Sequence, residues 1–97
     1  MTVNRIVPEG KTRVVVTVDS EYTFPLYKGE LARYRIREGE ELSEEAFAEI
    51  MRTLLPKRAK LRCMNLLKSR SYTRKQLMEK LRAGKYPEEV IEEAEIQ

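Results

Sequence analysis

The sequence predicts an α+β fold, mainly α, in which an N-terminal antiparallel β-meander precedes a series of short helices. Three observations support this prediction. Residues 12–18 are nearly all β-branched, which favours a pleated strand. From residue 43 onward, apolar side chains recur three and four positions apart, as they do in amphipathic helices. Isolated Gly and Pro residues, such as Gly84 and Pro87, separate these segments.

Three strands are predicted in residues 1–27, and the two longer ones form a hairpin. One turn at residues 8–11 ends the first strand, and another at residues 19–21 joins the second strand to the third. Pro25 cannot donate a ladder hydrogen bond, so the third strand should lie at a sheet edge. We expect the following helices to cover the apolar face, because so few strands are marginally stable alone. That face consists of Val14, Val16, Val18, Phe24 and Leu26.

Two helices are predicted between the strands and the basic part of the chain. The first is short, at residues 30–35, and Gly39 ends its segment. Ser43 is a favourable N-cap for the second, whose first turn contains two glutamates that suit the positive end of the helix dipole. Pro56 interrupts the apolar pattern that follows. Either a new helix begins there, or one long helix kinks.

Three further helices are predicted at residues 57–70, 74–83 and 87–96. Thr73 and Gln76 have the spacing of a capping box at the start of the second of these. The connections are short, which requires the three helices to pack closely. The apolar arc of the first helix is predicted to contain Ala59, Cys63, Met64, Leu66 and Leu67. The sequence thus divides into an N-terminal region, 1–42, and a helical region, 43–97.

Charge is distributed unevenly along the chain, although the formal net charge is only +3. Residues 56–86 contain eleven basic residues and one acidic residue, whereas residues 87–97 contain five glutamates and no basic residue. Such an excess attracts anionic partners, and the alternative is a solvated surface without a partner. Tyr72 and Tyr86 adjoin basic residues and could stack on bases. A tyrosine at a helix start more often packs against its own core, which is the interpretation we favour.

Residue types that support catalysis are scarce. The absence of histidine removes the usual general base near neutral pH and the commonest metal ligand. Cys63 falls on the predicted apolar arc, so we interpret it as a core thiol. The four glycines are isolated and form no phosphate-binding loop. We therefore expect no enzymatic activity, no metal and no cofactor. One cysteine and no membrane-length apolar run suit a cytoplasmic protein.

Three spaced patterns occur in order along the chain and together resemble the RecX family, the bacterial regulators of the RecA recombinase. The patterns are Tyr34-x-Ile36-x-x-Gly39-x-x-Leu42-Ser43, then Ala59-x-x-x-Cys63-x-x-Leu66-Leu67-x-x-Arg70-Ser71 with Leu77-x-x-Lys80-Leu81, then Gly84-x-Tyr86-Pro87-x-x-Val90-Ile91-Glu92. The resemblance covers the N-terminal part and the first three-helix repeat of the family. Family members typically continue into further repeats. The chain is therefore expected to be a fragment, a naturally short member, or one copy of several in an assembly.

The resemblance implies a non-enzymatic regulator of homologous recombination and the SOS response. Its expected partner is the RecA filament, which it would bind on DNA and inhibit, with single-stranded or double-stranded DNA as a possible further partner and no membrane contact. The expected contact residues are the basic ones of the helical region. They are Lys57, Arg58, Arg62, Lys68, Arg70, Arg74, Lys75, Lys80 and Arg82.

The residues themselves leave two alternatives open. Helices 74–83 and 87–96 could form a helix-turn-helix that binds nucleic acid without RecA. The second of these helices is acidic, however, and phosphates would repel it. The other alternative is an adaptor with no role on DNA.

Overall fold

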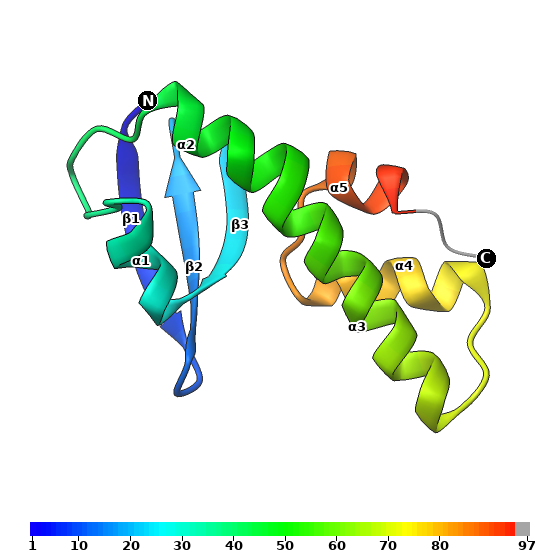
Figure 1. Ribbon diagram of the computed structural model, residues 1–97. Helices are drawn as coiled ribbons and strands as arrows, with labels where there is room; N and C mark the ends of the chain where they lie inside the picture. The colour runs from blue at the N-terminus through cyan, green and yellow to red at the C-terminus, as the bar shows by residue number, and fades with distance from the viewer. Residues whose placement is uncertain (95–97) are drawn as a thin grey trace. The chain divides into compact units, whose positions relative to one another are not determined.

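The computed structural model describes residues 1–94, and contacts divide the chain into unit 1 (Met1–Phe47) and unit 2 (Ala48–Gln97). A three-stranded antiparallel sheet comes first and helices follow, so the predicted α+β fold is confirmed (Figure 1). Each unit is described by itself below.

The sheet of unit 1 consists of β1 (Val3–Glu9), β2 (Arg13–Val18) and β3 (Tyr22–Tyr27), in the order β1-β2-β3. Val16 lies opposite both Ile6 and Phe24, which sets the register on the two sides of β2. The predicted apolar face is confirmed, because each of its five side chains is at most 3% exposed. Alternation along the strands therefore determined which face is buried.

The two outer strands of this sheet are β1 and β3. β3 is an edge strand, as Pro25 predicted. The outer side of β1 is paired in part with the segment that follows α1. The Val3 amide donates to the Glu40 carbonyl at 2.9 Å, and the Gly39 amide donates to the Val3 carbonyl at 2.7 Å. These bonds cover part of an edge that would otherwise expose unpaired backbone groups.

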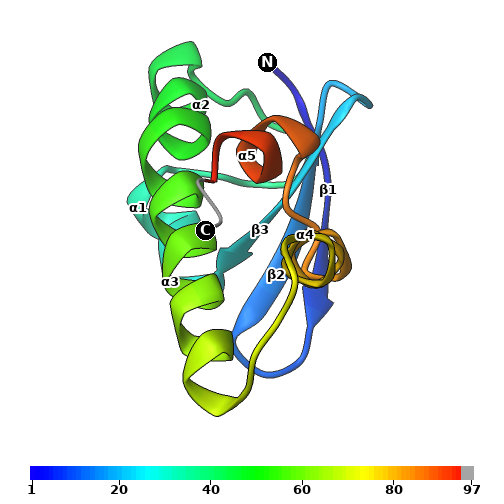
Figure 2. The ribbon, with the colours of Figure 1, turned by 90° about the vertical axis from the view of Figure 1, so that its right-hand side faces the viewer.

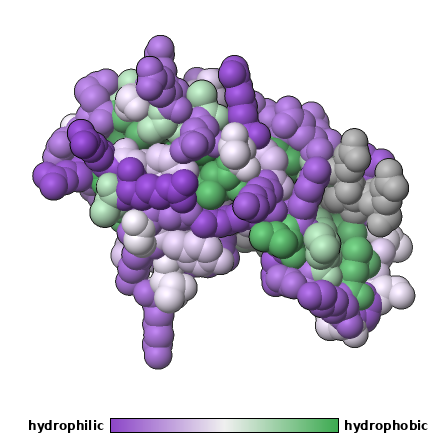
Figure 3. Space-filling view, in the orientation of Figure 1, coloured by the Kyte–Doolittle hydropathy of each residue, from purple (hydrophilic) through white to green (hydrophobic). Residues whose placement is uncertain are grey.

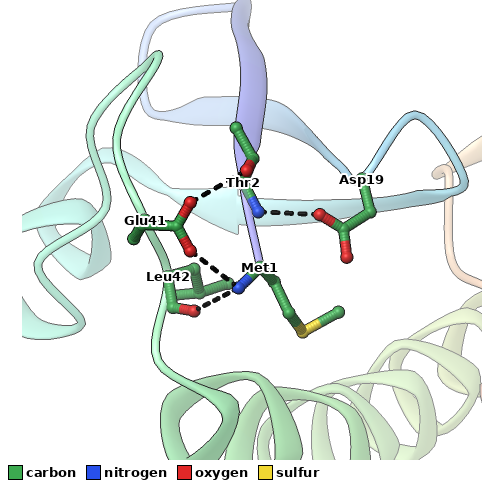
Figure 4. Close-up of polar contacts among 5 residues, drawn as sticks. All are labelled: Met1, Thr2, Asp19, Glu41 and Leu42. Atoms are coloured by element: carbon green, nitrogen blue, oxygen red, sulfur yellow. Dashed lines mark hydrogen bonds and ion pairs between the residues drawn. The ribbon is translucent and has the colours of Figure 1, made fainter.

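The start of β1 is also held by polar side chains (Figure 4). The Met1 ammonium lies 3.1 Å from the Glu41 carboxylate and donates to the Leu42 carbonyl at 3.2 Å. The Thr2 hydroxyl donates to the other Glu41 oxygen at 2.9 Å, and the Thr2 amide donates to Asp19 at 2.7 Å. Glu41 therefore joins the first strand to the connection between the helices.

Helical residues of unit 1 pack against the sheet, as predicted for its apolar face. α1 (Lys28–Arg33) contacts β3, and it begins and ends two residues earlier than the sequence predicted. α2 (Glu44–Glu49) starts with the expected N-cap, since the Ser43 hydroxyl accepts a bond from the Ala46 amide at 3.1 Å. The Phe47 ring meets those of Tyr22 and Phe24 edge to face, at centroid distances of 4.9 and 6.2 Å.

Pro56 neither opens a separate helix nor interrupts the helical path. A π-helical stretch, η1 (Ile50–Leu54), connects α2 directly to α3 (Leu55–Ser69). The Leu55 amide bonds to the Ile50 carbonyl, five residues back. A proline ring clashes with the carbonyl four residues before it, and a wider turn relieves that clash. The sequence signalled a disturbance at this proline, and the structure shows that it takes the form of a π turn.

Unit 2 contains α3, α4 (Arg74–Ala83) and α5 (Glu88–Glu93), with α4 and α5 on one side of α3 (Figure 2). The predicted capping box at α4 is confirmed, because Thr73 and Gln76 exchange bonds of 2.9 and 3.1 Å. Residues 95 and 96, the predicted end of the last helix, lie outside the described residues. The core of these helices consists of Leu55, Ala59, Cys63, Leu66, Leu77, Leu81, Val90, Ile91 and Ala94.

Candidate functional site

All nine predicted contact residues lie in unit 2, on α3, on α4 or in the loop between them. We call them the basic surface. Arg58 is half-buried and the other eight are exposed. Lys57 and Lys68 are eleven residues apart, which is about three helical turns, so they project from the same side of α3. That side is opposite the buried row that begins at Leu55 and Ala59.

A stripe of apolar side chains lies between these two lysines, and the sequence had suggested otherwise. Leu61, Met64 and Leu67 are 49%, 57% and 42% exposed. The prediction that Met64 and Leu67 belong to the buried arc was wrong, because α4 and α5 cover only one side of α3. Figure 3 shows the resulting hydrophobic area over the C-terminal half of α3. We call Leu61, Met64 and Leu67 the exposed apolar stripe.

Arg82, a member of the basic surface, has its charge compensated within unit 2. Its guanidinium donates to the Glu88 carboxylate from two nitrogens, with Nη2 at 2.7 Å from Oε1 and Nε at 2.9 Å from Oε2. These hydrogen bonds raise the pKa of Arg82 and lower the pKa of Glu88. Arg82 and Glu88 are six residues apart, a spacing that does not predict a contact from the sequence. The ion pair forms because the turn between α4 and α5 brings the two side chains together.

Arg70 is also engaged within its own unit. Its guanidinium carbon lies 4.6 Å from the centroid of the Tyr72 ring, within the range of a cation–π contact. Tyr72 is half-buried. The ring therefore already has one occupied face, which supports the structural role that we favoured for this tyrosine.

The rest of the basic surface retains its charge toward solvent. Within residues 1–94, six of its members make no ion pair and donate no side-chain hydrogen bond. Charges in this state are free to meet an anionic partner, and a nearby anion would displace only water and counterions. The six are Lys57, Arg62, Lys68, Arg74, Lys75 and Lys80.

Cys63 packs in the core, as predicted. It is 6% exposed, and burial raises the pKa of its thiol, an effect that the nearby positive charge of Arg62 opposes only in part. A thiol held in its neutral form is a poor nucleophile. Over the residues that the structure describes, no cluster of three or more His, Cys, Asp or Glu side chains could hold a metal ion. In the same range no helix combines the length and apolar character needed to cross a bilayer.

Comparisons with known proteins give a consistent family. Residues 59–94 match the family described as RecX, first three-helix domain. The regulatory protein RecX of Caldanaerobacter subterraneus subsp. tengcongensis is 32% identical over 95 residues, which cover 97% of this chain and 48% of that protein. A crystal structure of a regulatory protein RecX aligns with a TM-score of 0.46 and 26% identity, over 94% of this chain and 45% of that one.

The chain thus spans about half the length of the relatives it matches. The matched residues 59–94 begin at the buried Ala59 of α3 and end at the buried Ala94 that follows α5, so they contain most of the described core of unit 2. They also contain the whole exposed apolar stripe and seven of the nine basic-surface residues, all but Lys57 and Arg58. Residues 59–94 are thus similar to the first three-helix domain of the RecX family, and nearly the whole chain is similar to part of a RecX regulatory protein.

Proposed function

We propose that this protein is a non-enzymatic regulator that binds the RecA–DNA filament and inhibits RecA activities in recombination and the SOS response. The observation that carries the proposal is the coincidence of two features in one unit. Residues 59–94 match the first three-helix domain of RecX, and the same residues present uncompensated cations. The family supplies the identity of the partner, and the surface supplies a physical means of binding it.

The chemistry of α3 and α4 suits a partner made of both protein and nucleic acid. Uncompensated lysines and arginines bind phosphates and release counterions, which makes the affinity fall as salt rises. Phosphates gain nothing from the exposed apolar stripe, whereas a protein surface can bury it. A filament of RecA on DNA offers both kinds of contact, and bare DNA offers only one.

The helix-turn-helix alternative has less support. α5 would be its recognition helix, but this helix exposes Glu88, Glu89, Glu92 and Glu93. Carboxylates at these positions would face the phosphates that line the major groove. In the described part of unit 2, residues 48–94, no observation favours this arrangement over the proposed one.

Binding to three substrates at two salt concentrations tests the proposal. Labelled single-stranded DNA, duplex DNA and RecA-coated single-stranded DNA would each be titrated with the protein. We expect the RecA-coated DNA to bind most tightly and the affinity to fall steeply with salt. Tight binding to bare duplex with no gain from RecA would reject the proposal.

A matched pair of variants locates the surface. Lys57→Gln with Lys68→Gln removes two charges from the outer side of α3, and Arg5→Gln with Lys11→Gln removes two exposed charges from unit 1. The first pair should lower filament affinity by roughly tenfold and the second by much less. Equal losses would show that net charge matters and that α3 does not.

A further inference from the structure

The C-terminus of α1 adopts a backbone arrangement that usually requires glycine. The Ile36 amide donates to the Leu31 carbonyl at 2.8 Å, and the Arg35 amide donates to the Ala32 carbonyl at 3.2 Å. This pair of bonds defines a Schellman motif, in which the residue after the C-cap takes a left-handed conformation. That residue is Arg35, with φ of 55°. Glycine is favoured there because it has no Cβ to clash with the backbone.

The choice of arginine at this position calls for an explanation. A cation near a helix C-terminus interacts favourably with the helix dipole, which is one reason for it. Lys85 occupies the same position after α4, with φ of 69° and the corresponding bonds from Lys85 to Arg82 and from Tyr86 to Leu81. The dipole explains both cations equally. Arg35 differs from Lys85 in also lining a hollow on the surface of unit 1.

The hollow has a volume of about 620 Å³ and lies between α1 and the segment that follows it. Three cations and one carboxylate line it, together with apolar side chains of α1. The three cations are exposed, and within the described part of the chain none of them makes an ion pair. The cations are Lys28, Arg35 and Arg37, the carboxylate is that of Glu40, and the apolar residues include Leu31 and Ala32.

The backbone that carries these cations is fixed at several points. Ile36, between the two arginines, is only 3% exposed and anchors the segment in the core of unit 1. Gly39 and Glu40 are bonded to Val3 of β1, as described above. A ligand would therefore meet cations on an ordered support, which reduces the ordering cost of binding.

We propose that this hollow binds phosphate groups along the backbone of a nucleic-acid strand. The planar guanidinium groups of two arginines and the ammonium group of a lysine can donate hydrogen bonds to phosphate oxygens. Cations outnumber carboxylates in the hollow, which favours an anionic ligand. The hollow is partly open to solvent, so a strand that continues on both sides can reach it. No aromatic ring lines it, so bases have no stacking partner and binding is independent of sequence. This site lies in unit 1, outside residues 59–94, and does not depend on RecA.

The variant Arg35→Gly tests the proposal, because it removes the charge while relieving the backbone. We expect its thermal midpoint to equal or exceed that of the parent, since glycine suits the left-handed position. We expect its affinity for bare single-stranded DNA to fall roughly threefold to fivefold. The slope of log affinity against log salt should decrease by about 0.7, the value for one phosphate contact on a single strand.

Lys85→Gly is the matched control, since it makes the same substitution in the same backbone motif outside the hollow. It should share the effect on stability and show a smaller loss of DNA affinity. Arg37→Gln should lose affinity as Arg35→Gly does. The proposal is overturned if Arg35→Gly binds DNA as the parent does, or if Lys85→Gly loses as much.

A competition experiment identifies the class of ligand. Polyglutamate with the same number of charges as the oligonucleotide should compete poorly with DNA for the parent protein. If polyglutamate competes equally well, and this competition is lost in Arg35→Gly, the hollow accepts acidic polypeptides and the nucleic-acid assignment is wrong. RecA is absent from these measurements, so their outcome is independent of the filament proposal.

Discussion

The guanidinium of Arg82 and the carboxylate of Glu88 form a two-point ion pair across the turn between α4 and α5, with a closest distance of 2.7 Å. The pair holds the end of one helix to the start of the next. It also places a negative charge against one member of the basic surface. Glu88 therefore both supports the helix arrangement and reduces the positive charge available to a partner.

Glu88→Gln should increase the affinity of the protein for anionic polymers. The substitution removes one negative charge and releases Arg82, so binding to single-stranded DNA at low salt should rise roughly twofold to threefold. A filter-binding or anisotropy titration measures this. Glu9→Gln, an exposed carboxylate on β1, is the control for net charge. An equal gain in both variants would mean that the release of Arg82 contributes nothing.

The contact between Met1 and Glu41 should make unit 1 most stable over a limited range of pH. The Met1 ammonium, and next the Thr2 hydroxyl, lower the pKa of Glu41 from its ordinary 4.5, while Glu41 raises the pKa of the ammonium from 8.0. A lowered carboxyl pKa stabilises the fold above 4.5, and this contribution is lost as pH falls through the folded value. A raised ammonium pKa stabilises the folded state below pH 8.0. This contribution is lost as pH rises through the pKa of the ammonium in the folded protein.

Urea unfolding at a series of pH values checks this window. The midpoint should be highest between about pH 5 and pH 7.5 and should fall on both sides. In Glu41→Gln the fall at alkaline pH should become shallower, because the ammonium loses the carboxylate to which it is hydrogen-bonded. A variant whose alkaline limb matches that of the parent would exclude this contact as the cause.

The capping box at the start of α4 should be measurable as a coupled pair. Thr73→Ala removes the oxygen that accepts from the Gln76 amide, and it should lower the free energy of unfolding by about 1 kcal/mol. Thr73→Ser keeps that oxygen and should retain most of the stability. A double-mutant cycle with Gln76→Ala gives the interaction energy, and a value of zero would mean that the two bonds form independently of each other.

Cys63 should react slowly with alkylating reagents in the folded protein. The thiol is buried and its raised pKa keeps it protonated near neutral pH, so little thiolate is present to react. The rate of reaction with iodoacetamide should increase steeply once urea unfolds unit 2. A rate in the folded protein equal to that of a free thiol would show that the site opens readily.

Local signals in the sequence were sufficient for much of the fold. The alternation along β2 and β3 predicted the buried face, and the Pro25 ring predicted an edge strand. Ser43 and Thr73 marked helix starts correctly, because N-caps act through bonds to residues two or three positions away. These features share a short range along the chain, which is why residue order alone reveals them.

The features that the sequence did not reveal depend on tertiary arrangement. Met64 belongs to an apolar pattern, but whether it is buried depends on how much of α3 its neighbours cover. Arg82 pairs with Glu88 only because the intervening turn returns the chain. The left-handed backbone of Arg35 gave no signal, since arginine is unusual at that position. The basic surface was identifiable from charge density, whereas its partner remains a prediction.

The exposed apolar stripe should distinguish binding to protein from binding to nucleic acid. Leu61 and Met64 are about half exposed, so Leu61→Gln with Met64→Gln should change the urea midpoint little. If a protein surface of the RecA filament covers the stripe, the loss of this apolar area should lower filament affinity by roughly tenfold. Affinity for bare single-stranded DNA should stay the same, because phosphates make no use of these side chains.

Val7→Gln is a control of comparable exposure in unit 1, where Val7 is 46% exposed on β1. It should leave both affinities unchanged. If the α3 variant loses affinity for bare DNA as much as for the filament, the stripe supports the shape of the basic surface and does not contact protein. If the α3 variant keeps both affinities, the outer side of α3 is not part of the filament interface. Lys57 and Lys68, which flank the stripe, would then not contact the filament from this side of the helix.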